Sequence, residues 1–156
     1  MSEPLFRVSE WPMAHFARIE RQHQANANAL LKSHGLKHTE WRILALTDEV
    51  KRASVSQIVD LVVIERTTIG KLIDRLVERG WLSKQKSAED ARAVSVELTA
   101  AGRKLLRQTA PDMLALMQRY SQAISRSEFS DLMKTLQRYG RSVDQSGSEL
   151  HAGRTE

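Results

Sequence analysis

Hydrophobic residues recur at helical spacing along most of the chain. The first such pattern covers residues 11–33, with Pro12 in the first turn of the predicted helix and Gly35 just past its end. Proline and glycine favour those two positions, because proline needs no N–H partner there and glycine accepts a left-handed backbone. A second helix is predicted to begin with Thr39 as its N-cap.

The next two segments have the pattern of short amphipathic helices. Ser54 and Gln57 have the spacing of a capping box, which predicts that a helix begins at Ser54. A fourth helix is predicted over residues 66–79, and Gly80 is expected to end it. The inward stripe of this fourth helix consists of Ile69, Leu72, Ile73 and Leu76.

Beyond the fourth helix the hydrophobic period changes from helical to alternating. Residues 81–86 and 92–98 are predicted strands, and the polar segment between them makes a β-hairpin with a charged tip. Thr99 is the expected N-cap of a long helix that ends near residue 125, and a last helix covers residues 127–141. This order of elements predicts a mainly α fold with a small β-hairpin wing, a winged helix-turn-helix.

Composition narrows the chemistry that such a fold can carry. The net charge is +5 and the isoelectric point is about 9.8, which favours an acidic partner such as DNA, RNA or an anionic membrane surface. The absence of cysteine excludes disulfides, thiolate metal sites and thiol redox sensing. No apolar run approaches the ~20 residues that span a bilayer, and no signal sequence is recognisable, so we expect a soluble cytoplasmic protein.

The outward face of the predicted helix 66–79 has residues suited to DNA. An α-helix fits the major groove, where the residues of its first turns meet base edges. The residues concerned are Arg66, Thr67, Thr68, Gly70, Lys71, Arg75 and Arg79. By itself this helix is ambiguous, because Asp74 and Glu78 could pair with the arginines at helical spacing on an ordinary solvated face.

The predicted hairpin supplies a second basic element. Lys84 and Lys86 lie on its first strand, and Arg92 lies at its tip. An arginine there can enter the minor groove, where the negative potential favours it. Asp90 would aim Arg92 through a charge-assisted hydrogen bond, although an incidental surface turn is the simpler interpretation of these two residues alone. The helix and hairpin together favour DNA recognition in both grooves.

Three stretches of the sequence resemble the multiple antibiotic resistance regulator (MarR) family of transcriptional regulators. RTTIGKLIDRLVERGWL at residues 66–82 resembles the recognition helix of that family, EDAR at 89–92 its Asp-x-Arg wing, and VELTAAG at 96–102 its strand-to-helix junction. Two positions depart from the family pattern. Gly70 stands where Ser or Thr is frequent, and Lys84 stands where Arg is frequent, which loses bidentate geometry at a phosphate.

The resemblance implies a homodimer that binds double-stranded DNA at a pseudo-palindromic operator. Residues 1–35 would form an N-terminal dimerisation helix, 36–99 the DNA-binding region and 100–141 the C-terminal dimerisation helices, with 142–156 as a disordered tail. An intramolecular bundle would also cover the apolar stripes of the terminal helices. The predicted DNA-binding residues are Ser54, Arg66, Thr67, Thr68, Lys71, Arg75, Lys84, Lys86, Asp90 and Arg92.

The resemblance also implies a repressor that a small ligand releases from DNA, often an aromatic or anionic compound. The ligand pocket is expected between the dimerisation helices and the DNA-binding region. The candidate ligand-binding residues are Trp11, His15, Phe16, Ile19, His38, Trp41 and Arg42. The usual burial of such residues favours plain core for Phe16, Ile19 and Trp41, and a surface salt bridge is an equal alternative for Arg42.

Three other functions have less support in the sequence. A metal-responsive regulator would use histidines, yet Gly35 breaks the helix between His34 and His38, the one pair at suitable spacing, so no metal and no cofactor are predicted. An enzyme is disfavoured, because no phosphate-binding loop, nucleophile elbow or zinc-protease motif is present. A winged-helix module that docks proteins would need an apolar patch on the helix 66–79, where the sequence has charges.

Overall fold

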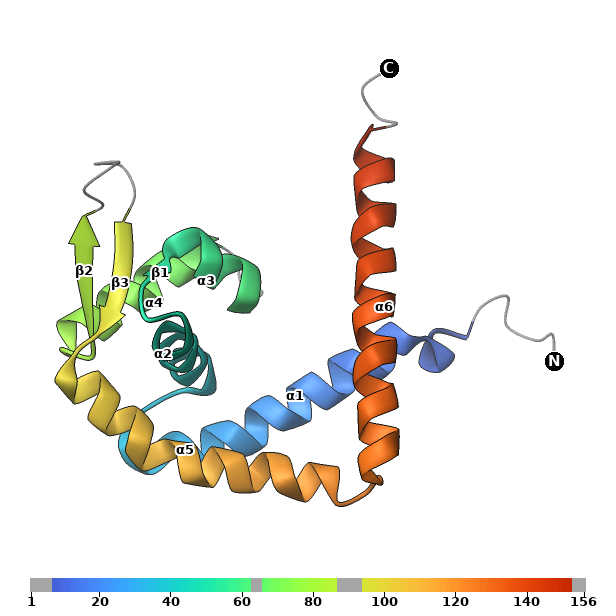
Figure 1. Ribbon diagram of the computed structural model, residues 1–156, viewed down its shortest axis with the longest axis horizontal. Helices are drawn as coiled ribbons and strands as arrows, with labels where there is room; N and C mark the ends of the chain where they lie inside the picture. The colour runs from blue at the N-terminus through green and yellow to red at the C-terminus, as the bar shows by residue number, and fades with distance from the viewer. Residues whose placement is uncertain (1–6, 63–65, 87–93, 153–156) are drawn as a thin grey trace. The chain divides into compact units, whose positions relative to one another are not determined.

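A computed structural model of the chain describes residues 7–62, 66–86 and 94–152 (Figure 1). The fold is mainly helical, with one small antiparallel sheet. The helices are α1 (Pro12–Leu31), α2 (His38–Val50), α3 (Val55–Val62), α4 (Arg66–Glu78), α5 (Ala100–Ser121) and α6 (Arg126–Ala152), with short 3-10 helices at Val8–Glu10 and Lys32–His34. The strands are β1 (Ala53–Ser54), β2 (Leu82–Lys86) and β3 (Val94–Leu98).

The chain divides within α5 into two compact units, one that ends at Leu114 and one that begins at Ala115. The first unit holds α1 to α4, the sheet and most of α5. The second unit holds the end of α5 and all of α6. None of the described helices is both long and apolar enough to cross a membrane.

Most helix ends follow the local sequence signals. Pro12 is the first residue of α1, and Gly35 and Gly80 have the left-handed backbone expected after a helix, with φ of 61° and 70°. The predicted capping box at the start of α3 is confirmed. Gln57 N donates to Ser54 Oγ at 3.2 Å, and Ser54 N donates to Gln57 Oε1 at 2.9 Å.

Three details differ from the prediction. The second helix begins at His38 rather than after Thr39, because Glu40 caps it by accepting the Lys37 N–H at 2.8 Å. A third strand, β1, pairs with β3. It was not predicted, because two residues are too few to show an alternating hydrophobic pattern. The predicted disordered tail is wrong over residues 142–152, which continue α6, since no proline interrupts them.

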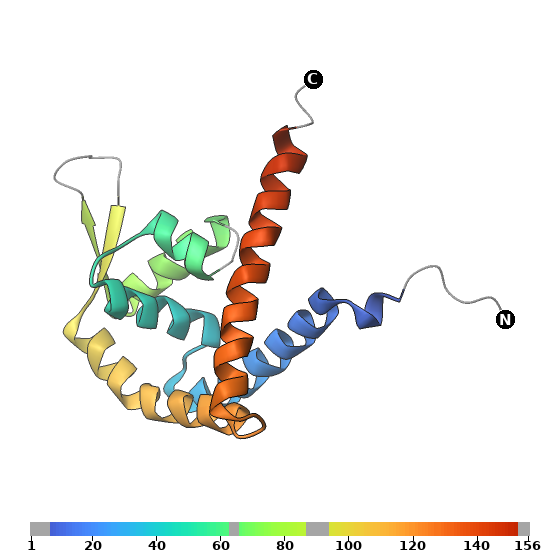
Figure 2. The same cartoon turned by 45° about the vertical axis from the view of Figure 1, so that its right-hand side comes forward.

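The core of the first unit lies between α2, α3, α4 and the sheet, whose strand order is β1-β3-β2. The predicted inward stripe of α4 is buried at Ile69, Ile73 and Leu76. Val96 and Leu98 of β3 are buried as well, as their alternation predicts. Figures 1 and 2 show α4 beside the β2–β3 hairpin and behind α2 and α3, and it contacts β2, α3 and α2.

The junction between β3 and α5 fastens the long helix to the turn that follows α4. Thr99 Oγ1 accepts the Gly102 N–H at 3.0 Å, as expected of an N-cap, and donates to Gly80 O at 2.6 Å. Thr99 N also donates to Trp81 O at 3.1 Å. A Cβ at Gly102 would lie 2.1 Å from Trp81 O, so this close approach of two backbones requires glycine.

The second unit leaves an apolar stripe exposed along α6. Its helix begins with a capping box in which Ser125 N donates to Glu128 Oε2 at 2.7 Å, and the hydrogen bonds from Ser125 lower the pKa of Glu128. Apolar positions then recur at helical spacing on a largely exposed surface. The exposed large apolar residues of this unit are Met117, Tyr120, Ile124, Phe129, Leu132, Met133, Tyr139 and Val143.

Candidate nucleic-acid interface

The first turns of α4 present polar side chains to solvent. Thr67, Thr68 and Lys71 are exposed, and none of them has a side-chain hydrogen bond or ion pair with another described residue. A Cβ at Gly70 would meet no atom of the described residues within 4 Å, so none of them requires glycine there. We call residues 67–71 the exposed half of α4. It offers one cation and two hydroxyl groups to a partner.

The later turns of α4 are tied to the rest of the first unit. Asp74 forms a salt bridge with Lys84 of β2, which fixes the hairpin to the helix. Arg75 Nη2 lies 2.5 Å from Oε1 of Glu40 on α2, as an ion pair without the alignment of a hydrogen bond. We call residues 74–79, which comprise the end of α4 and the residue that follows it, the anchored half of α4. The same-helix pairing that the sequence allowed for Asp74 is replaced by a pair with β2.

Arg79 makes a third attachment at the end of α4. Its Nη1 donates to Gly35 O at 2.8 Å, in the turn between α1 and α2. Its guanidinium also lies over the ring of Trp81, 3.7 Å from the centroid, in a cation–π contact. Both contacts use the arginine within the protein and therefore compete with the contact to DNA that the sequence suggested for Arg79.

The remaining predicted DNA-binding residues differ in their contacts and in how far the structure describes them. Ser54 is half-buried, and its hydroxyl caps α3, so its first role is in the fold. Lys84 is in the salt bridge with Asp74. The backbones of Arg66 and Lys86 lie in α4 and β2, but their side chains are outside the description, and Asp90 and Arg92 are outside the described residues altogether.

Two predicted ligand-binding residues, Trp41 and Arg42, lie together in the structure. They line a cavity of about 190 Å³ on one face of α2, with Ala45, Leu46 and Val62 as its apolar part. Trp41 Nε1 donates to Thr109 Oγ1 of α5 at 3.0 Å. Arg42 Nη1 lies 3.6 Å from Glu20 Oε1 of α1, as the salt-bridge alternative predicts. Glu49 also lines the cavity, which therefore combines an aromatic ring, an arginine, a carboxylate and apolar walls.

His38 lies buried beside these residues in sequence, at the start of α2. Its ring packs edge-on against that of His23, with centroids 4.5 Å apart. The pKa of His38 is lowered from 6.5 to about 4, mainly by burial and also by the nearby His23 and Arg42, against an opposing effect of Glu20. The imidazole is therefore neutral at physiological pH. His23 and Glu20 were missed as parts of this cluster, because they lie in the polar middle of α1.

The other four candidate ligand residues are spread along α1. Trp11, His15 and Ile19 are exposed and Phe16 is half-buried, so the core interpretation is wrong for Ile19. None of them lines the cavity at Trp41. Among the residues that the structure describes, no group of three His, Cys, Asp or Glu side chains could hold a metal ion.

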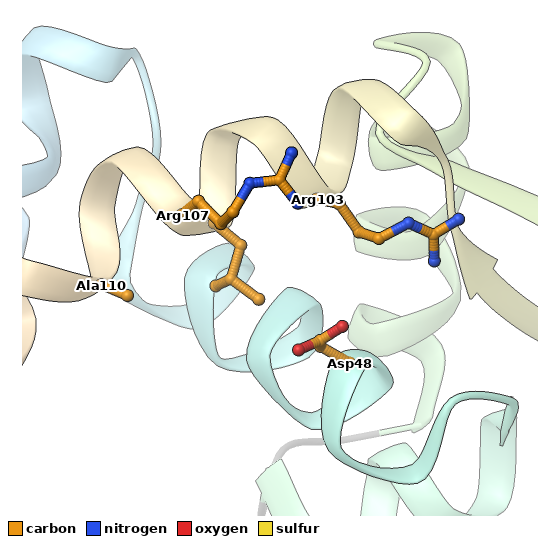
Figure 3. A pocket seen from close by; sticks show the side chains of 5 residues that line it. Asp48, Arg103, Arg107 and Ala110 are labelled. Carbon is orange, nitrogen blue, oxygen red and sulfur yellow. The ribbon is translucent and has the colours of Figure 1, made fainter.

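A second cavity of about 190 Å³ lies between α2 and α5 (Figure 3). Arg103 and Arg107 come from successive turns of α5, and Asp48 faces them from α2, with Leu106 and Ala110 as the apolar lining. The two guanidinium groups extend along α5 and do not converge on one point (Figure 3). This cavity could not be predicted from the sequence, because its two sides are far apart along the chain.

Helices α2, α3 and α4, the three-stranded sheet and the exposed half of α4 define a winged helix-turn-helix protein. A profile of the MarR family matches residues 34–93. The HTH-type transcriptional repressor IacR of Pseudomonas putida is 27% identical over 131 residues, which cover 84% of this chain and 78% of that relative. The profile match and this relative confirm the resemblance to the MarR family of transcriptional regulators that the sequence predicts.

Solved structures share the fold at low sequence identity. A MarR/EmrR family transcriptional regulator from Acinetobacter sp. ADP1 superposes with a TM-score of 0.82 at 19% identity, covering 90% of this chain and 99% of that one. BpsR of Bordetella bronchiseptica, whose DNA binding is regulated by 6-hydroxynicotinic acid, has a TM-score of 0.77 at 21% identity, covering 88% of this chain and 98% of that one.

Proposed function

We propose that the protein is a sequence-specific DNA-binding repressor that a small molecule releases from its operator. The observation that carries the DNA-binding part is the exposed half of α4. Thr67, Thr68 and Lys71 lie in the first turns of a helix whose opposite face is buried, which is the position from which a recognition helix meets base edges. The proposed role involves no catalytic step and places the protein with DNA in the cytoplasm.

The proposed DNA contacts divide into base-directed and phosphate-directed residues. Thr68 and Lys71 are the base-directed candidates, with Arg66 and Thr67 beside them at the helix start. Arg75, Lys84 and Lys86 are phosphate-directed candidates, Ser54 contributes at the start of α3, and Arg92, aimed by Asp90, enters the minor groove. The net charge of +5 supports strong and salt-dependent attraction to DNA.

We further propose that two copies associate through the helices before residue 36 and after residue 99. Met13 and Ile19 of α1 are exposed, as is the apolar stripe of α6. Exposed apolar patches of this extent mark protein–protein interfaces. A two-fold dimer would set its two recognition helices about 34 Å apart, which requires a pseudo-palindromic operator.

The effector is proposed to be a small aromatic acid or a related anion. The cavity at Trp41 and Arg42 supports this class, because an aromatic ring can stack on tryptophan while a carboxylate pairs with arginine. BpsR, which shares the fold, is regulated by such a compound. Arg42→Gln should abolish the release of DNA by a responsive compound, whereas Arg107→Gln, in the cavity of Figure 3, should leave it intact.

Selection from random DNA tests the central claim. The purified full-length protein should enrich one pseudo-palindromic motif at physiological salt, and the bound fragments then serve to screen aromatic acids for release. Retention of random DNA without enrichment would instead favour a non-specific DNA-binding role. Failure to retain DNA at all would favour the protein-docking alternative.

A further inference from the structure

Glu40 is a carboxylate buried in the first turn of α2, with 1% of its surface exposed. Buried carboxylates are rare unless they are paired, because an ionised group loses its hydration there. Both oxygens of Glu40 have a partner. Oε2 accepts the Lys37 N–H at 2.8 Å, and Oε1 lies 2.5 Å from Arg75 Nη2. One oxygen therefore caps α2, and the other holds the recognition helix α4.

Arg75 is only partly used by this ion pair. Its side chain is 44% exposed, whereas that of Glu40 is 2% exposed. A guanidinium has five N–H donors in a planar fork, so a contact at one nitrogen leaves donors on the other edge. Glu40 thus restricts the orientation of a cation that still faces solvent on the outer side of the protein.

A second contact, parallel to the first, comes from one turn further along α4. Arg79 Nη1 donates to Gly35 O at 2.8 Å, and Gly35 belongs to the turn that leads into α2. Two arginines of α4 at i and i+4 therefore contact the same short segment, residues 35–40. Two contacts along one helix restrict both its sliding and its rotation about its own axis.

We propose that Glu40 is a positioning residue for DNA recognition, which acts through Arg75. It holds the Arg75 guanidinium ready for a backbone phosphate, and it fixes the rotation at which the exposed half of α4 faces the bases. The inference rests on the proposed function, because positioning matters only if α4 enters DNA. A carboxylate next to this interface repels phosphate, so its contribution is to selectivity rather than to overall attraction.

Glu40→Gln separates positioning from attraction. The substitution keeps the shape of the side chain and an acceptor for Lys37 N, but it removes the ion pair and makes each protomer more positive by one charge. We expect binding to random DNA to be equal or stronger, and binding to the selected operator to be weaker. The ratio of operator affinity to random-DNA affinity should fall about ten-fold.

Asp60→Asn is the matched control, since it removes the same charge from an exposed position on the neighbouring helix α3, away from the cavity at Trp41 and Arg42. Its affinity ratio should remain within about two-fold of the unaltered protein. An unchanged ratio in Glu40→Gln would overturn the inference. So would a parallel loss of operator and random-DNA binding, with circular dichroism showing a folded protein, because that pattern means lost attraction.

The combination with Arg75→Gln tests whether Glu40 acts through Arg75. If it does, the affinity ratio of the double variant should lie within about two-fold of the ratio of Arg75→Gln alone, because the effects of coupled residues are not additive. Full multiplication of the two effects would overturn the inference. Hydrogen exchange distinguishes a local loosening of α4 from a general loss of stability. In Glu40→Gln, the amides of α4 should exchange faster than in the unaltered protein, and the amides of the β2–β3 pairing should exchange at the same rate.

The proposed function and this inference fail in different ways. If the unaltered protein enriches no DNA sequence, the proposed function fails before Glu40 is tested. If the unaltered protein selects an operator and Glu40→Gln selects it equally well, only the positioning role fails.

Discussion

The two halves of α4 share one helix but differ in what their polar side chains do. In the exposed half, Thr67, Thr68 and Lys71 face solvent without a partner among the described residues. In the anchored half, Asp74, Arg75 and Arg79 reach β2, α2 and the turn before α2. The same outward pattern of charge in the sequence therefore serves two tasks, contact with a partner and attachment to the fold.

This difference explains how a short helix can be both presented and fixed. A recognition helix must expose its first turns to the groove, and those turns cannot also pack against the protein. Its orientation must then come from the other end. The three attachments of the anchored half, added to the buried stripe Ile69, Ile73 and Leu76, supply that orientation. Substitutions that disturb the anchored half should therefore lower the stability of the fold, whereas substitutions in the exposed half should weaken DNA binding without lowering stability.

Gly102→Ala should have the largest effect, because it disturbs the junction that follows the anchored half. The added Cβ would lie 2.1 Å from Trp81 O, so two backbones must separate. We expect a loss of about 3 kcal/mol in the free energy of unfolding, measured by urea denaturation. Ala101→Ser, at the exposed neighbouring position, should change it by less than about 0.5 kcal/mol. Equal stability of the two variants would show that the two backbones can separate at this junction at little cost in free energy.

Acid should weaken the segment on which the anchored half rests. His38 is buried there with its pKa lowered from 6.5 to about 4, so the unfolded chain takes up a proton more readily than the folded protein. The stabilisation by neutral His38 is complete above the unfolded pKa and is lost as the pH falls towards 4. From about pH 7 to about pH 5 we expect a loss of about 2 kcal/mol from this residue.

The contribution of His38 can be isolated by substitution. Urea denaturation across this pH range should show a much smaller pH dependence in His38→Gln than in the unaltered protein. His34→Gln, at a half-buried position before the same turn, should retain the full dependence. An unchanged slope in His38→Gln would show that the acid sensitivity does not come from His38.

Thr68→Ala and Lys71→Ala should affect DNA and leave the fold intact. Neither side chain has a partner among the described residues, so the free energy of unfolding should change by less than about 0.5 kcal/mol. Operator binding should weaken by about 1–3 kcal/mol and the preferred bases should change, as measured by repeated selection from random DNA. A uniform loss on all sequences would reassign the residue concerned to a phosphate contact.

The sequence predicted the exposed half of α4 better than the anchored half. The buried stripe follows from the 3.6-residue period, and the ends of α3 and α4 follow from Ser54, Gln57 and Gly80, all of which are local signals. The β-hairpin follows from the alternating hydrophobic pattern, although its tip lies outside the described residues. These features depend on neighbours in the sequence, which is why they could be predicted.

The partners of the anchored half depend on tertiary packing instead. Asp74 had a plausible partner on its own helix, yet β2 brings Lys84 to it. Glu40 and Arg75 are far apart in the chain and meet only because α2 crosses near α4. The contact of His23 with His38 has the same origin. No periodicity of a single sequence encodes such pairs, so charges predicted as phosphate contacts proved to have partners within the protein.

Gly70→Ala gives the smallest and most discriminating effect, because stability and DNA binding should move in opposite directions. Alanine in the interior of α4 should raise the free energy of unfolding by about 1 kcal/mol, since glycine is the poorer helix former and the added Cβ meets no protein atom. If the exposed half lies against DNA, the same methyl group enters that contact and operator affinity falls. Gly140→Ala, also with no atom near its added Cβ, should stabilise without that loss. Should Gly70→Ala bind the operator as well as the unaltered protein, α4 approaches DNA elsewhere, and Thr67, Thr68 and Lys71 are exposed without being the contact surface.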